Sequence, residues 1–423
     1  MLYCFLSESF SPKRRGLPWK RNKSLESLRL DCSWRLFSHK RYYHPAGEER
    51  SDMNNEQKKE QDRMAKNAEI PANAVKIRNY DFLENKTLQT VRMPDSVTVI
   101  ELGAFSGCTG LTSIQFSANL TIIEENAFSN CTGLTSIELP PNMEKIGINA
   151  FQGCTGLTSL RIPPGVMEIG GGAFFGCTGL QSIILPADIM KIGPGAFGGC
   201  SGLRTPLIWK SILLAWGASG GDVVVPTEVT KIDHGAFSGY HGVTSIAMHD
   251  NITEIGSFAF DECADLKSIV LPAKITKINV GTFWDCKKLN SVRIPSSVTE
   301  IGERAFFGCS ALKSIELPAS VTKIRPNAFE ECTELVSIEI PPSMTRIGMG
   351  AFVHCTGLKS IRLPQKVVTI DDGTFFGCTS LTSIVIQNSA AEIGRSAFSG
   401  CKNLKDIQAS PEQKKTILSQ MQT

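Results

Sequence analysis

The stretch Pro295-Ser-Ser-Val-Thr-Glu-Ile-Gly-Glu-Arg-Ala-Phe306-Phe-Gly-Cys309-Ser-Ala-Leu312-Lys-Ser-Ile315-Glu-Leu317 contains one complete unit of a repeat that organises most of this chain. At its end, apolar and polar residues alternate, which is the spacing of a strand with one buried face. The proline that follows this strand cannot donate a ladder hydrogen bond and therefore ends it. The Val-x-x-Ile and Ala-Phe-x-x-Cys segments then supply a second apolar wall.

Phenylalanines mark the period of the repeat, which is 23 residues on both sides of a single gap. They stand at Phe82, Phe105, Phe128, Phe151, Phe174 and Phe197 and, after a gap of 40 residues, at Phe237, Phe260, Phe283, Phe306, Phe329, Phe352, Phe375 and Phe398. The gap equals one period plus a 17-residue insertion. One unit has too few apolar residues to form a core alone, so the units must stack and share one. The period therefore predicts a solenoid.

The unit resembles the BspA-like (Treponema-type) leucine-rich repeat, Leu-x-x-Ile-x-Ile-Pro-x-x-Val-x-x-Ile-Gly-x-x-Ala-Phe-x-x-Cys. Fourteen such repeats cover about residues 70–409. The resemblance implies an α/β solenoid, a curved leucine-rich-repeat array with a parallel β-sheet on its concave face. It also implies a function in adhesion or protein binding. The insertion, at about residues 204–221, resembles a hydrophobic hairpin that interrupts arrays of this family.

Several units depart from the pattern. Asn85 and Tyr240 occupy the cysteine position, Asp81, Thr282 and Thr374 replace the alanine, and Pro206 stands where a strand isoleucine belongs. Because proline removes a ladder donor, we expect the array to be locally broken at the insertion.

The two ends of the chain do not follow the repeat. Residues 1–69 are predicted to form a basic, partly disordered extension with a helical cap, and residues 410–423 a C-terminal helical cap. Residues 1–44 hold ten Lys and Arg against three acidic residues. This composition suits an organelle transit segment, a nuclear-import patch or a basic tail without any address. We expect a cytoplasmic protein, with nucleus, organelle or cell surface as alternatives.

Twelve of the fourteen cysteines fall at one position of the repeat, and Cys4 and Cys32 lie outside it. Zinc sites typically use ligand pairs two to four residues apart, and no cysteine here has so near a neighbour. A thiol between Phe and Leu on an apolar wall behaves as a small buried hydrophobe. We therefore predict reduced, buried cysteines and no metal or cofactor.

Motifs of catalysis are missing from the sequence. It contains no phosphate loop, dinucleotide fingerprint or Gly-x-Ser-x-Gly elbow, and His354 beside Cys355 has no third partner at catalytic spacing. With a net charge of +3, the repeat array is not expected to bind nucleic acid. No apolar stretch is long enough for a transmembrane helix. We predict no enzyme, but a monomeric, non-catalytic protein–protein interaction scaffold with an unidentified protein as partner; the alternative is a cell-surface adhesin or antigen-like binding protein.

Two regions are candidates for the partner site. On the strands, a uniform serine column is flanked by variable columns, from which we select Lys267, Arg293, Lys313, Lys359 and Arg362. In the hairpin we select Leu207, Trp209 and Trp216, since tryptophan is frequent among residues that dominate binding energy. Each region has a plainer explanation. The charges can be an ordinary solvated sheet face, and the hairpin can fold onto the solenoid and repair the defect at Pro206.

Overall fold

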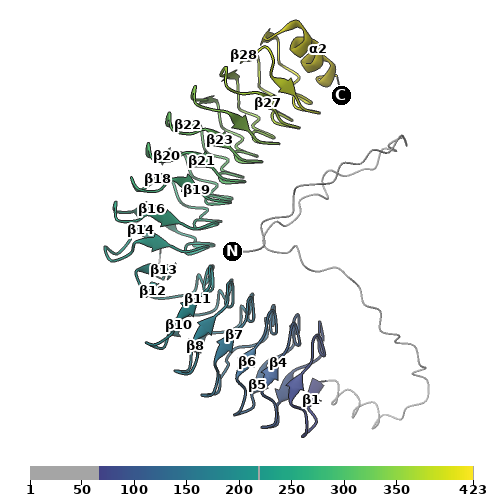
Figure 1. Ribbon diagram of the computed structural model, residues 1–423, viewed down its shortest axis with the longest axis vertical. Coiled ribbons are helices and arrows are strands. Elements are labelled where there is room, and N and C mark those ends of the chain that lie inside the picture. Colours follow the sequence, from purple (N-terminus) through teal and green to yellow (C-terminus); the bar gives the residue numbers. More distant parts are fainter. Residues whose placement is uncertain (1–65, 218–219, 423) are drawn as a thin grey trace, which may run out of the picture. The chain divides into compact units, whose positions relative to one another are not determined.

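The computed structural model describes residues 66–217 and 220–422. The chain divides into two compact units, Met1–Asn54 and Asn55–Thr423, and the described residues all belong to the second. The basic N-terminal extension and its helical cap fall almost wholly outside the described residues. Within the second unit each 23-residue repeat forms one coil, and the coils stack on one another (Figure 1).

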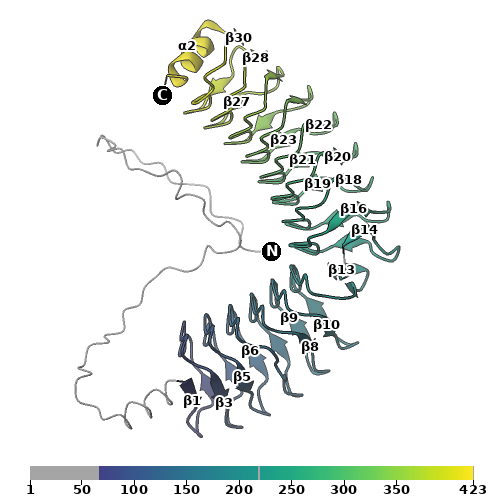
Figure 2. The ribbon, with the colours of Figure 1, turned by 180° about the vertical axis from the view of Figure 1, so that it is seen from behind.

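A typical coil has three sides. The first is a strand of three to five residues, the second is a strand of two residues, and the third is a series of turns that contains the Ala-Phe-x-x-Cys segment. We call these sides the long-strand face, the short-strand face and the turn face. Figures 1 and 2 show the long strands along one edge of the stack and the short strands along the other.

The long-strand face consists of β1 (Asn67–Glu69), β3 (Thr90–Arg92), β5 (Ser113–Gln115), β8 (Ser159–Arg161), β10 (Ser182–Ile184), β14 (Gly221–Val224), β16 (Val243–Ala247), β18 (Ser268–Val270), β20 (Ser291–Arg293), β22 (Ser314–Glu316), β24 (Ser337–Glu339), β26 (Ser360–Leu363), β28 (Ser383–Ile386) and β30 (Asp406–Gln408). The short-strand face consists of β2 (Lys76–Ile77), β4 (Val99–Ile100), β6 (Ile122–Ile123), β7 (Lys145–Ile146), β9 (Glu168–Ile169), β11 (Lys191–Ile192), β15 (Lys231–Ile232), β17 (Glu254–Ile255), β19 (Lys277–Ile278), β21 (Glu300–Ile301), β23 (Lys323–Ile324), β25 (Arg346–Ile347), β27 (Thr369–Ile370) and β29 (Glu392–Ile393).

Neighbouring coils pair in parallel and in register. Ser268 of β18 lies opposite Ser291 of β20, and Glu300 of β21 lies opposite Lys323 of β23. The partners in these pairs are one period apart, so each residue of the repeat forms a column along the stack. The predicted solenoid of parallel strands is confirmed.

The phenylalanines form one such column in the core. Phe306 is fully buried and its ring lies parallel to that of Phe329, with 5.2 Å between the centroids. Beside it runs the cysteine column, in which the thiol of Cys309 donates to the carbonyl oxygen of Phe283 at 3.1 Å. All twelve repeat cysteines are buried free thiols. Their predicted burial is confirmed, and Cys4 and Cys32 lie outside the described residues.

Two departures from the repeat are accommodated by local hydrogen bonds. Thr282 and Thr374 are buried in place of alanine, and their hydroxyls donate to the carbonyl oxygens of Asn279 and Asp371 at 2.8 and 2.7 Å. A buried hydroxyl without a partner would be destabilising, so the turn itself satisfies the added oxygen.

The insertion forms a further coil of its own. Strands β12 (Leu207–Trp209) and β13 (Ile212–Ala215) pair antiparallel as a hairpin, and β13 also pairs in parallel with β15 on the short-strand face. Strand β14 then pairs with β16 on the long-strand face. Between β13 and β14, Trp216 takes the place of the phenylalanine and stacks on Phe237 at 5.3 Å. The hairpin thus serves as one edge of a complete but shortened coil.

The shortened coil divides the core. One cluster of buried residues runs from Ile77 to Leu203 and ends with Leu214 and Ala215, whereas the other begins with Leu213 and Trp216 and runs to Ile417. On the turn face the coils on either side of the insertion meet directly, since the amide of Gly199 donates to the carbonyl oxygen of Gly235 at 2.9 Å. The array is locally irregular here, as the sequence predicts.

Tyr240 explains why this unit lacks the usual cysteine. Its hydroxyl donates to the carbonyl oxygens of Cys200, at 3.2 Å, and of Trp216. A cysteine donates only to the preceding coil, but the longer tyrosine reaches across the shortened coil to the coil before it. Tyr240 is buried, and its hydroxyl supplies a donor to the carbonyl oxygen of Trp216, while that of Cys200 also accepts from the amide of Leu203 at 3.2 Å.

Helix α2 (Pro411–Gln420) closes the C-terminal end, where the sequence predicts a helical cap. Ser410 and Gln413 form a capping box at its start. The amide nitrogen of the Gln413 side chain donates to the carbonyl oxygens of Asn388 and Ala391 at 3.0 and 2.8 Å. The Gln420 side chain donates to Gly394 and accepts from the amide of Phe398. The helix thus satisfies backbone groups of the last coil.

Candidate functional site

The long-strand face presents two kinds of side chain in alternation. In β20, β22 and β24 the middle residue is buried and its two neighbours are exposed. The serine column points outward, as the sequence predicts, and the residue before each serine lies at the entry to the strand. Lys267, Lys313 and Lys359 occupy this entry position and are exposed.

The residue two positions after Lys313 and its equivalents is part of the buried wall, and the third residue forms the outer variable column. There Arg293 of β20 lies opposite Val270 of β18, and Arg362 of β26 lies opposite Val385 of β28. Glu316 and Glu339 lie opposite each other between these arginines. Lys313 approaches Glu334 at 4.0 Å, and both side chains are more than half exposed, so this ion pair contributes little to stability.

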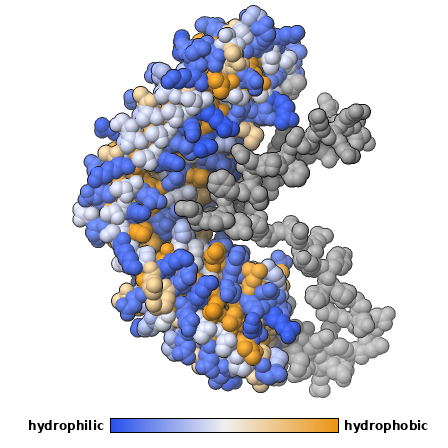
Figure 3. All heavy atoms as spheres, in the orientation of Figure 1, coloured by the Kyte–Doolittle hydropathy of each residue, from blue (hydrophilic) through white to orange (hydrophobic). Residues whose placement is uncertain are grey.

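An exposed apolar row crosses the middle of this face, which the sequence reading missed. Val224 lies opposite Ala247, and Val270 follows in the next strand of the same sheet. Val224 and Val270 are 71% and 58% exposed, respectively. Figure 3 shows apolar patches over this part of the array, beside β12 and β14. The sequence holds one signal of this row: Ala247 and Val270 interrupt a column that elsewhere contains charged residues such as Arg293.

The hairpin residues are less accessible than the strand residues. Trp216 is only 7% exposed and belongs to the core. Leu207 and Trp209 are half-buried, and the ammonium group of Lys210 lies 4.5 Å from the centre of the Trp209 ring. The structure therefore separates the three hairpin candidates: Trp216 lies inside the stack, whereas Leu207 and Trp209 lie at its surface.

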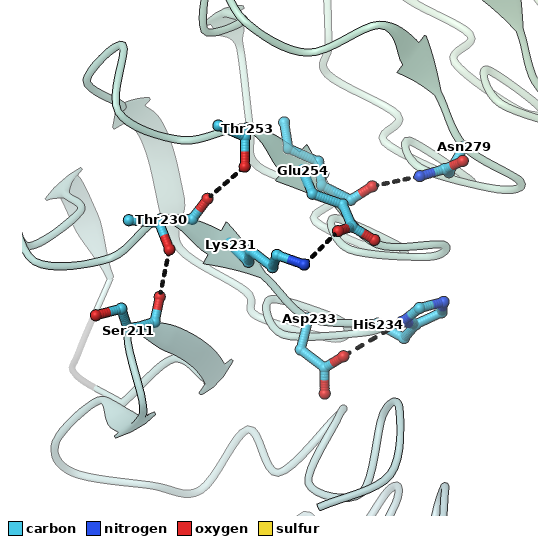
Figure 4. A network of polar contacts seen from close by, with 9 residues as sticks. Ser211, Thr230, Lys231, Asp233, His234, Thr253, Glu254 and Asn279 are labelled. Atoms are coloured by element: carbon cyan, nitrogen blue, oxygen red, sulfur yellow. Dashed lines mark hydrogen bonds and ion pairs between the residues drawn. The ribbon is translucent and has the colours of Figure 1, made fainter.

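The short-strand face is built from ordered ladders, shown near the insertion in Figure 4. The hydroxyl of Thr253 donates to the carbonyl oxygen of Thr230 at 3.3 Å, and that of Thr230 donates to Ser211 in the hairpin coil at 3.4 Å. Beside them Lys231 and Glu254 form an ion pair at 3.0 Å. Most polar groups on this part of the face thus already bind one another.

The turn face carries acidic residues with perturbed pKa values. Burial, reinforced by the neighbouring charge of Glu262, raises the pKa of Asp261 to about 8, although Ser238 donates a hydrogen bond to it at 3.2 Å. Burial also raises the pKa of Asp285 and Glu330. Ser238 is the side chain that hydrogen-bonds to Asp261, and no histidine among the described residues joins this contact, so the carboxyl resembles a structural group more than part of a catalytic pair.

The described residues show no arrangement typical of an enzyme. They contain no group of three or more His, Cys, Asp or Glu side chains placed to hold a metal ion. The Cys355 thiol donates to the carbonyl oxygen of Phe329, while His354 packs edge-on against Phe376. His234 contacts Asp233 at 3.3 Å (Figure 4). Among residues 66–217 and 220–422, no helix is long and apolar enough to cross a membrane.

Solved structures of leucine-rich proteins are similar to this chain. A leucine-rich repeat protein from Bacteroides ovatus is 28% identical, covering 69% of this chain and 83% of its own, with a TM-score of 0.42. A leucine-rich cell surface protein from Faecalibacterium prausnitzii is 25% identical, covering 82% and 89%, with a TM-score of 0.48. A leucine-rich repeat protein from Eubacterium ventriosum, 21% identical over 66% and 88%, has a TM-score of 0.51 and supports the fold alone.

No match was found among curated proteins. The BspA-type leucine-rich repeat region, in contrast, matches residues 65–211, 218–336 and 324–421. These ranges include both halves of the core and helix α2. They cover far more than half of the sequence, and the resemblance inferred from Phe306, Cys309 and their equivalents is confirmed. The chain belongs to the BspA-type leucine-rich repeat family.

Proposed function

We propose that this chain is a non-catalytic scaffold that binds another protein on its long-strand face. The observation that carries the proposal is the exposed apolar row Val224–Ala247–Val270, which continues in register into Arg293. Exposed apolar residues that adjoin one another mark interaction sites more often than scattered ones do. The row lies in the middle of the array and is flanked by the exposed Lys267.

The charges around the row favour an acidic partner. Lys267, Lys313, Lys359 and Lys405 are exposed at the strand entries, and Arg293 and Arg362 add positive charge to the outer column. Among the described residues none forms an ion pair with Lys267 or Arg293. We infer a partner segment with apolar residues for the row and acidic residues for these cations. Electrostatic attraction of this kind raises the association rate and weakens with salt.

In this proposal the hairpin has two functions. Trp216 stabilises the array because it completes the core of the shortened coil. Leu207 and Trp209 are half-buried at the surface of the hairpin, and in this proposal they extend the contact with the partner. Trp216→Ala is therefore expected to lower the melting temperature and leave affinity unchanged, while Trp209→Ala is expected to weaken binding.

The proposal is tested with peptides selected from a random phage-displayed library on the full-length protein. We expect the selected peptides to combine acidic and apolar residues, and their affinity to fall as salt rises. The triple variant Lys267→Glu/Lys313→Glu/Lys359→Glu should weaken binding about tenfold or more in fluorescence polarisation. Lys191→Glu/Lys277→Glu/Lys323→Glu makes the same change of charge on the short-strand face and is the matched control. Equal losses in both triple variants, or peptides without acidic residues, would contradict the proposal.

The compartment is a separate prediction. Cytoplasmic location is what the sequence predicts, and display on the cell surface would fit the adhesin alternative. Localising a tagged full-length chain beside one that lacks residues 1–69 distinguishes these outcomes and identifies any targeting activity of the basic segment.

A further inference from the structure

A groove lies on the short-strand face of the coils that contain β2, β4 and β6, away from the long-strand face. It has a volume of about 490 Å³ and is open to solvent. Val99 and Ile122 are among its lining residues, together with Lys76 and the carboxylates of Glu101, Glu124 and Glu125. The groove therefore combines an apolar surface with an acidic border.

The apolar part of the groove departs from the pattern of its face. In later coils this column holds charged residues that pair between coils, such as Glu168 with Lys191 at 2.6 Å and Lys231 with Glu254 at 3.0 Å. Val99 and Ile122 instead lie side by side in the ladder, next to Lys76 and Lys145 respectively. Both are half-buried, so they leave apolar surface where other coils have an ion pair.

The acidic part departs from the pattern as well. Glu101 and Glu124 follow their strands at the position that glycine holds in the next coils. At Gly147 and Gly170 an added Cβ would come within 2.5 Å of the backbone of the preceding coil. The coils of Gly147 and Gly170 are therefore closed at this position, whereas Glu101 and Glu124 line the groove.

The charges of the groove do not balance. Lys76 binds Glu101 at 3.0 Å, and this contact lowers the pKa of Glu101. Glu125 accepts a hydrogen bond from the neutral amide of Asn126 at 3.2 Å. Among the described residues no cation forms an ion pair with Glu124 or Glu125. Two carboxylates beside an apolar surface are thus left for a cation from outside.

We propose that this groove binds a lysine or arginine side chain of a partner protein. The methylene groups of such a side chain would cover Val99 and Ile122, and its charged end would meet Glu124 and Glu125. Long basic side chains combine an apolar stem with a cationic head in this way, and a charge-assisted hydrogen bond to a carboxylate is stronger than a neutral one. The site is opposite in charge to the long-strand face, so it recognises a different part of a partner or a different partner.

The proposal is tested with Nα-acetyl-lysine amide and the full-length protein, by saturation-transfer difference NMR, which detects weak binding. We expect saturation of the lysine methylene protons and a much weaker signal from Nα-acetyl-norleucine amide, which has the apolar chain without the charge. Glu124→Gln/Glu125→Gln should raise the Kd for the lysine probe about tenfold. Ile122→Lys, which introduces the type of residue found in neighbouring coils, should abolish binding because its own ammonium group competes for the carboxylates.

The matched control is Glu316→Gln/Glu339→Gln, which removes the same charge from the long-strand face and should leave the Kd unchanged. Circular dichroism of each variant checks that the array remains folded. Equal binding of the two probes, or unchanged binding by both groove variants, would overturn the proposal. The Lys267→Glu/Lys313→Glu/Lys359→Glu variant changes only the long-strand face and should bind the lysine probe with an unchanged Kd. A failure of the groove proposal is therefore distinguishable from a failure of the proposed function.

Discussion

The coil that contains Phe306 and the coil that contains Trp216 hold equivalent places in the stack but complete their cores differently. Phe306 stacks on a phenylalanine on each side, with 5.2 Å between ring centroids in both directions. Trp216 stacks only on Phe237, and no ring stacking joins it to Phe197 among the described residues. Its indole nitrogen is buried without a hydrogen-bond partner among the described residues.

The difference shows how a repeat array tolerates an irregular unit. A regular coil obtains its contacts from neighbours identical to itself, so each column continues without adjustment. The shortened coil contributes no cysteine to the cysteine column, and its Trp216 continues the phenylalanine column on one side only, toward Phe237. Its neighbour compensates through Tyr240, whose hydroxyl reaches two coils at once. Stability at the insertion therefore depends on a few specific contacts and not on repetition.

Phe306→Ala tests the regular region and should have the largest effect. It removes a fully buried ring from the middle of a column and is expected to lower the free energy of unfolding by about 3–5 kcal/mol. Trp216→Ala, which interrupts a column that already ends there, should cost less. Urea unfolding monitored by circular dichroism measures both values. An equal or larger loss for Trp216→Ala would remove the distinction between the two regions.

Tyr240→Phe tests the compensation at the insertion. The variant keeps the ring but leaves the carbonyl oxygen of Trp216 without this donor, whereas that of Cys200 still accepts from the amide of Leu203. We expect a loss of about 1–3 kcal/mol in the same assay, since a buried polar group without a partner is destabilising. Cys309→Ala removes one weaker thiol donor in the regular region and serves as the comparison. If Tyr240→Phe is neutral, water or a local shift replaces the hydroxyl.

Thiol labelling measures how often each region opens. Cys200 ends one core cluster, whereas Cys332 lies in the middle of the other. Local opening is easiest where a core is divided, so Cys200 should be modified roughly tenfold faster than Cys332 in the native protein, equivalent to about 1.4 kcal/mol. Burial raises the pKa of both thiols, so their labelling requires opening. Peptide mapping by mass spectrometry separates the two sites, and equal rates would show that the insertion is not a weak point.

Asp261→Asn should produce the smallest effect, and one that depends on pH. The pKa of Asp261 is raised above its unfolded value by burial, to about 8, so the folded state holds a proton that the unfolded state releases. Stability should therefore fall as pH rises from about 4 to about 8. The asparagine variant cannot ionise and should be more stable than the native protein at pH 8.5, by about 1 kcal/mol, but not at pH 4. Thermal unfolding at the two pH values measures this difference, and an identical difference at both would contradict it.

Much of the fold follows from the sequence because the period places each residue type in one column. The outward position of the serine column is a consequence of alternation within the strand. The burial of Phe306 and Cys309 follows from the repeated apolar pattern of the turn segment that contains them. The coil formed by the insertion was not predictable in this way, since Trp216 replaces phenylalanine and the segment lacks the repeat pattern. The apolar row was missed for the same reason: the register that places Val224 beside Ala247 crosses the insertion.

The groove on the first coils illustrates the other limit of sequence reading. Val99, Ile122 and Glu124 each look like an ordinary substitution in a variable position. Their spacing of one period makes Val99 and Ile122 neighbours, and the register of β4 and β6 confirms it. Comparison of each unit with the repeat consensus would have detected these substitutions, but it would not have revealed the groove that they line.

Helix α2 covers the last coil of the described array. A last coil with free backbone groups offers the same hydrogen bonds that every internal coil offers to its successor, and is in effect a template for adding another molecule. Gln413 and Gln420 already satisfy these groups with their side-chain amides, and they do so from a helix, whose own backbone cannot continue the ladder. The helix therefore covers the end of the described array, and we expect removal of residues 411–422 to expose these backbone groups to pairing with a second molecule.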